Sequence, residues 1–82
     1  MKYCLITFRT VTPAQRGESI LRRAGIGCSL QRTPRSMEEQ GCGYSLRLRD
    51  TDAEMARQLL REAGVGFQKT YLMGEDGRME PI

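Results

Sequence analysis

Residues 21–27 are Leu-Arg-Arg-Ala-Gly-Ile-Gly, and residues 60–66, at a constant spacing of 39 residues, are Leu-Arg-Glu-Ala-Gly-Val-Gly. Before the first glycine of each copy, apolar residues recur at the spacing typical of a helix that packs on one side. Gly25 and Gly64 stand where such a helix ends, because the residue after the last turn often has a positive φ that glycine adopts without strain. The repeat therefore predicts two helices that end in the same way.

The beginnings of the two helices are also marked. Thr12 is a favourable N-cap, and Pro13 suits the first helical position because a backbone N–H there has no helical partner. In the second copy residues 51–54 are Thr-Asp-Ala-Glu, a capping box in which both side chains can bond backbone N–H groups. The sequence thus predicts helices that start directly after Thr12 and Thr51.

Strand-like segments precede and follow each helix. Side chains alternate over residues 3–8 and 44–49, and further strand-like runs cover 28–32 and 67–73. The order of elements is then βαββαβ, which predicts an α+β, ferredoxin-like sandwich. In that architecture a four-stranded antiparallel sheet carries both helices on one face.

The chain of 82 residues suits one domain. We expect a single ferredoxin-like domain over residues 1–73 and a flexible C-terminal tail over the turn-rich residues 74–82. Tyr3 and Leu5 then fall on the sheet face that carries no helix. They are either ordinary, partly exposed residues or part of a surface for a partner or a homodimer.

Composition excludes several classes of protein. The 13 Lys and Arg residues and the 10 Asp and Glu residues are spread along the chain, which disfavours nucleic-acid binding. Histidine is absent, so Ser–His–Asp and Cys–His catalysis are excluded within the chain, and we predict no enzyme, metal or cofactor. No apolar run is long enough to span a membrane, and the three cysteines form no disulfide pattern. The sequence predicts a cytoplasmic protein that does not associate with membranes.

The cysteines occupy different settings. Cys4 and Cys28 lie on the apolar sides of their predicted strands, where cysteine packs as a small hydrophobic residue. Cys42 instead lies between Gly41 and Gly43 in a connection of residues 33–43 that is much longer than most hairpin loops. Because glycines leave the neighbouring sulfur uncovered, Cys42 is the candidate functional thiol.

The electrostatic surroundings of Cys42 could act in either direction. Arg35 would favour the thiolate if the connection folds back, whereas Glu38 and Glu39 would oppose it. We further expect both helix C-termini to lie at this end of the sheet, where their dipoles disfavour a negative charge.

The elements Thr33-Pro34-Arg35-Ser36 and Cys42-Gly43, between a helix that ends in Ala-Gly-Ile and a strand, resemble a small bacterial family of selenium/sulfur carrier-like proteins. The resemblance extends from residue 1 to about residue 73. It implies a carrier that holds sulfur or selenium on Cys42 as a persulfide or selenopersulfide, with Pro34, Arg35, Ser36, Gly41 and Gly43 as supporting residues. The implied partners are donor or acceptor enzymes, such as a desulfurase or enzymes of a selenophosphate pathway.

An alternative function remains open from the residues. The same scaffold could be a non-enzymatic module that binds a ligand or a protein through the open sheet face. RNA binding, which this topology also supports in other proteins, is disfavoured because residues 43–48 lack the aromatic-rich pattern of RNA-recognition strands.

Overall fold

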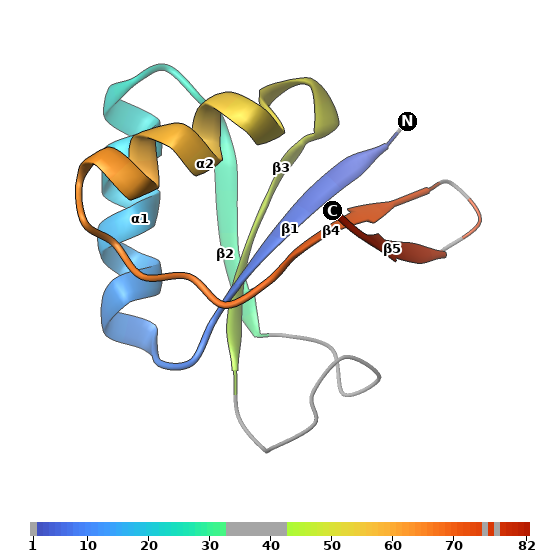
Figure 1. Cartoon of the computed structure of the whole chain (residues 1–82), viewed down its shortest axis with the longest axis horizontal. Helices are drawn as coiled ribbons and strands as arrows, with labels where there is room; N and C mark the ends of the chain where they lie inside the picture. Colours follow the sequence, from blue (N-terminus) through green and yellow to red (C-terminus); the bar gives the residue numbers. More distant parts are fainter. Residues whose placement is uncertain (1, 33–42, 75, 77) are drawn as a thin grey trace.

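The computed structural model describes residues 2–32, 43–74, 76 and 78–82 (Figure 1). Among them it forms five strands, two α-helices and one short 3₁₀ helix, η2. The strands are β1 (Tyr3–Phe8), β2 (Cys28–Arg32), β3 (Tyr44–Arg49), β4 (Thr70–Met73) and β5 (Met79–Pro81). The helices are α1 (Val11–Arg23), η2 (Asp50–Asp52) and α2 (Ala53–Glu62).

The strands form one antiparallel sheet in the order β2-β3-β1-β4-β5. The α+β class is confirmed, but the prediction of four strands is wrong, because β5 pairs with β4 at the edge of the sheet. A proline is tolerated in β5 because an edge strand can leave one backbone position without a ladder bond. The fifth strand departs from the ferredoxin-like pattern, so that assignment stays a prediction, as does a domain boundary at residue 73.

The ends of both α-helices are formed as the repeat predicts. Gly25 has a φ of +83° and Gly64 a φ of +72°. In each case the amide of the next residue donates to the carbonyl five positions earlier at 2.9 Å. This bond satisfies a carbonyl that the helix itself leaves without a partner, and it turns the chain back toward the sheet.

The beginnings of the helices differ from the prediction. The N-cap of α1 is Thr10 rather than Thr12, and the N-cap of α2 is Asp52, which follows η2. Neither N-cap side chain bonds the helix, so the capping box predicted from Thr51 and Glu54 does not form. The short turn η2 takes up the residues that the capping pattern assigned to the start of the helix.

Both helices pack against the same face of the sheet and enclose the core (Figure 1). Alternate residues of the central strands point into this layer, as the pattern of residues 3–8 and 44–49 predicts. The fully buried members of the core are Cys4, Ile6, Phe8, Ala14, Leu21, Leu46, Ala56 and Leu60.

Side chains on the helix-free face of the sheet are more deeply buried than expected. Leu5 and Ser45 belong to this face by alternation, and both are 0% exposed. Tyr3 is half-buried, with the Arg47 guanidinium 3.9 Å from the centre of its ring. Leu5 therefore offers no surface for docking, which removes its contribution to the predicted partner or dimer face.

Gly17 marks the closest approach of α1 to the core. A Cβ atom at this position would lie 3.2 Å from Leu46 and Leu60 and 3.3 Å from Phe8. All three neighbours are 0% exposed and have little room to move. We therefore expect Gly17→Val to lower the free energy of unfolding by about 1–3 kcal/mol, as overpacking does.

Urea denaturation measures this loss, and Gln15→Val is the matched control because Gln15 is exposed on the same helix. The control carries the cost of valine in a helix without the clash. Equal destabilisation by the two substitutions would show that Gly17 is not required by packing.

Candidate functional site

The structure describes only one end of the predicted site. Pro34, Arg35, Ser36, Gly41 and Cys42 lie outside the described residues. Gly43 is described, and it joins the 33–42 segment to the start of β3. The geometry that follows is therefore that of the residues to which this segment is attached.

The 33–42 segment connects β2 to β3, and the strand residues on either side of it pair with each other in the sheet. Arg32, the last residue of β2, is the partner of Tyr44, the first residue of β3. The Arg32 guanidinium lies 6.0 Å from the centre of the Tyr44 ring, within reach of a cation–π interaction. Tyr44 packs against the core, as its place in the alternation predicts. Both attachment points are thus held by the body of the protein.

Helix α1 begins at the same end of the sheet. Phe8, the last residue of β1, pairs with Tyr44, and α1 starts at Val11 (Figure 1). The expectation that both helix C-termini lie here is wrong for α1, because its preceding strand runs antiparallel to β3. We call this region the attachment end; its described residues are 7–12, 31–32, 43–45 and 68–70.

The attachment end is positively charged. Its described residues include Arg9, Arg32 and Lys69 and contain no Asp or Glu. The first turn of α1 also has no acidic residue, so the positive end of its dipole is not neutralised there. The charges of these described residues favour an anion, in contrast to the expectation from the direction of α1.

The two described cysteines are free and buried, which confirms their predicted role in packing. Burial raises the pKa of the Cys4 thiol from 9.0 to about 11. Burial also raises the pKa of the Cys28 thiol, and a hydrogen bond with Arg22 partly opposes this. Since thiolates, not thiols, react with electrophiles, neither cysteine is suited to sulfur chemistry in the folded protein.

The described residues bring together no three His, Cys, Asp or Glu side chains that could hold a metal ion. Neither α1 nor α2, the α-helices of the described chain, is long and apolar enough to cross a bilayer.

A second group of side chains, which the sequence reasoning missed, lies between α2 and the edge of the sheet. Arg57, Arg61 and Phe67 line a pocket of about 260 Å³ there, together with residues 68–70 and 81–82. The two arginines are four positions apart, a spacing that places them on one face of a helix. That spacing is the feature of the sequence from which the pair of arginines could have been predicted. Phe67 lies beside them only because of the tertiary fold.

Comparison with known proteins identifies one relationship. Residues 3–72 match the family described as "Putative Se/S carrier protein-like". Comparisons with curated proteins and with solved structures gave no match. The matched residues include the attachment end and nearly the whole sheet. This chain belongs to the Se/S carrier protein-like family.

Proposed function

We propose that the protein carries one sulfur or selenium atom on Cys42 as a persulfide or selenopersulfide. The observation that carries the proposal is the burial of the other two thiols. Cys4 is 0% exposed and Cys28 is 8% exposed, and burial raises the pKa of both. Cys42 is thus the remaining thiol for the role that the family description names.

The charge of the attachment end supports this role. Thiol exchange requires a thiolate, and a neighbouring positive charge increases the fraction of a thiol that is ionised. Arg9, Arg32 and the start of α1 all lie at the end of the sheet to which the 33–42 segment is attached. They lower the energy of an anion in that region without any histidine.

The loading step is a thiol exchange without net oxidation. The Cys42 thiolate attacks the terminal sulfur of a persulfide on a donor enzyme. The donor's S–S bond breaks, its electron pair stays on the donor cysteine as a thiolate, and a new S–S bond forms on Cys42. Delivery to an acceptor releases the terminal atom and returns the Cys42 thiolate. The partners are donor and acceptor enzymes of sulfur or selenium metabolism, met in a reducing, cytoplasmic setting, and the chain itself acts as a carrier rather than an enzyme.

The test loads the protein with sulfur and weighs it. A cysteine desulfurase is supplied with cysteine, and the carrier is then analysed by intact-protein mass spectrometry without reductant. We expect wild type to gain the mass of one sulfur atom and Cys42→Ser to gain none. Cys28→Ala is the matched control, since it also removes one thiol, and it should load like wild type.

Loading of Cys42→Ser would contradict the proposal. So would a wild-type protein that takes no sulfur or selenium from any persulfide or selenopersulfide donor. In that case a binding module that needs no thiol, the alternative open from the sequence, becomes the better account.

A further inference from the structure

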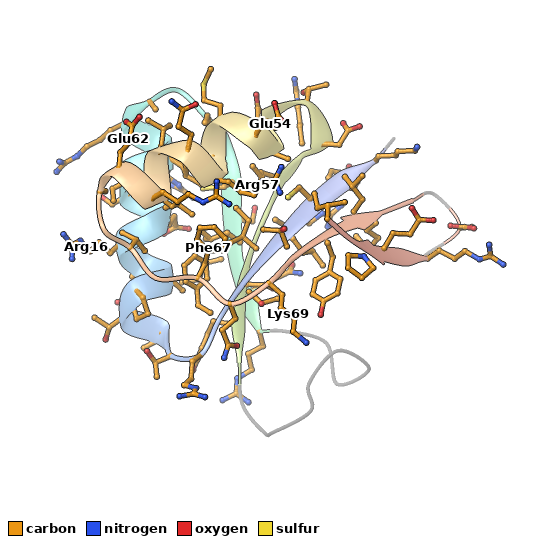
Figure 2. The ribbon with its side chains drawn as sticks, in the orientation of Figure 1. Arg16, Glu54, Arg57, Glu62, Phe67 and Lys69 are labelled. Carbon is orange, nitrogen blue, oxygen red and sulfur yellow. The ribbon has the colours of Figure 1, made fainter. Side chains whose placement is uncertain are left out.

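The pocket between α2 and β4 combines positive charge with a small volume. Arg57 and Arg61 of α2 line one side, and residues 67–70 of the chain that returns from α2 to β4 line the other. Figure 2 labels Arg57, Phe67 and Lys69 of this group. Lys69 adds a third cation at the rim, and no Asp or Glu lines the pocket. From this arrangement we propose that the pocket is a binding site for a phosphate group carried by a small molecule.

Both arginines are positioned by contacts that leave most of their donors available. Arg57 is half-buried, and its Nη1 donates to the Ile82 backbone oxygen at 3.2 Å. The Arg61 guanidinium lies 5.9 Å from the centre of the Phe67 ring, and Phe67 packs against the core. A guanidinium has five N–H donors, so each can bind an oxyanion and still keep its structural contact.

The positive charge of these arginines is only partly compensated by nearby described residues. The ion pairs recorded between described residues join Arg22 to Glu18 and Arg78 to Asp76. No Asp or Glu of a described residue forms an ion pair with Arg57 or Arg61, but the oxygen that Arg57 contacts belongs to Ile82, the last residue of the 82-residue chain, and is a carboxylate oxygen. Guanidiniums that share one wall present planar forks that match phosphate oxygens.

The opposite wall is held in place by β1. The Lys69 backbone N–H donates to the Thr7 hydroxyl at 3.0 Å, and the Lys69 carbonyl accepts from the Thr7 backbone N–H at 2.8 Å. Lys69 therefore has a fixed backbone and an exposed side chain. The backbone of this wall is thus held against the sheet before any ligand binds.

Volume and charge together select the ligand class. Pockets for drug-sized molecules usually measure about 300–1,000 Å³, and this one measures about 260 Å³. A phosphate group fits within this volume, and because the pocket is largely open to solvent, the rest of the ligand can extend outward. Three cations against the single carboxylate of Ile82 leave an excess of positive charge, which favours a dianionic phosphate over a singly charged carboxylate.

The test titrates ¹⁵N-labelled protein with inorganic phosphate at constant ionic strength and follows the backbone amides by NMR. We expect saturable shifts centred on residues 57–61 and 67–70, and only weak shifts with acetate. Arg61→Gln should weaken phosphate binding about tenfold, the loss of one charge-assisted interaction. Arg61 is exposed, so this change leaves the core intact.

Arg16→Gln is the matched control, because Arg16 is exposed and lies on α1 away from the pocket (Figure 2). It removes the same charge and should change the affinity by less than about twofold, the effect of net charge alone. Equal weakening by both variants, shifts spread over the whole surface, or equal binding of acetate would overturn the proposal. Cys42→Ser should bind phosphate like wild type, so failure of the carrier function and failure of this site are distinguishable.

Discussion

Phe8→Ala is expected to lower the free energy of unfolding by about 3–5 kcal/mol, the range found when a buried aromatic side chain is truncated. Phe8 is 0% exposed and lies beneath Gly17 of α1. A domain of 82 residues has a total stability of about 4–12 kcal/mol. The substitution therefore removes a large share of the stability, and urea denaturation followed by circular dichroism measures it.

Phe8→Leu is the control for this prediction. It keeps most of the apolar volume, so it should cost less than about 2 kcal/mol. Because Phe8 pairs with Tyr44, the alanine variant should also loosen the attachment end. Faster amide hydrogen exchange at residues 44–46 than in the leucine variant is the expected sign. A loss below about 1 kcal/mol for Phe8→Ala would show that the core around β1 is not close-packed.

Raising the pH is expected to destabilise the protein through Cys4. The folded protein holds the pKa of this thiol at about 11 instead of 9.0. Below pH 9 the thiol is neutral in both states, and its stabilising contribution is fully present. Above pH 9 the unfolded chain loses the proton first, so the contribution declines until the pH passes about 11. Two units of pKa correspond to about 2–3 kcal/mol.

Cys4→Ala isolates this effect from other groups that titrate in the same range. The alanine variant is less stable at neutral pH because it leaves a small cavity, but its stability should fall less steeply from pH 9 to pH 11. Denaturant midpoints at several pH values for both proteins give the comparison. Parallel pH profiles would mean that Cys4 ionises as readily in the folded protein as in the unfolded chain.

The helix ends were predictable from the sequence because they depend on local conformation. Gly25 and Gly64 both adopt positive φ values, which glycine reaches without strain. The starts of the helices were predicted less well. Thr12 and the Thr51–Glu54 box are favourable caps in isolation, yet α1 begins earlier and η2 precedes α2. The N-caps differ from the predicted ones by two residues in α1 and one residue in α2, the range over which helix boundaries are least well defined.

The strands were also predictable only in part. Alternation located β1 and β3, since burial on one face imposes a period of two. The strand-like runs after the helices located β2 and β4, although β4 begins at Thr70, three residues later than predicted. β5 was missed because its three residues carry no pattern of their own and are strands only through pairing with β4. Leu5 was assigned to the helix-free face correctly, but alternation does not report how far neighbouring side chains cover that face.

The features of the candidate site were likewise predictable only in part from the sequence. Glycines on both sides of Cys42 single out this thiol in the sequence alone, and alternation assigns Cys4 and Cys28 to the core. The sequence did not give the charge of the attachment end, because that depends on the direction of α1 relative to β3. It also did not bring Phe67 to Arg61, since their contact requires the turn at Gly64 and the return of the chain to β4.

By itself, then, the amino-acid sequence determined the helix ends, the presence of four of the strands and the assignment of Cys4 and Cys28 to the core. These features follow from φ preferences, periodicity and neighbouring residues, all of which act over a few positions. Only the tertiary structure decided the fifth strand, the burial of Leu5, the positive attachment end and the pocket that contains Arg57 and Arg61. Those features arise where segments distant in the chain meet, and their energies depend on contacts that no local pattern specifies.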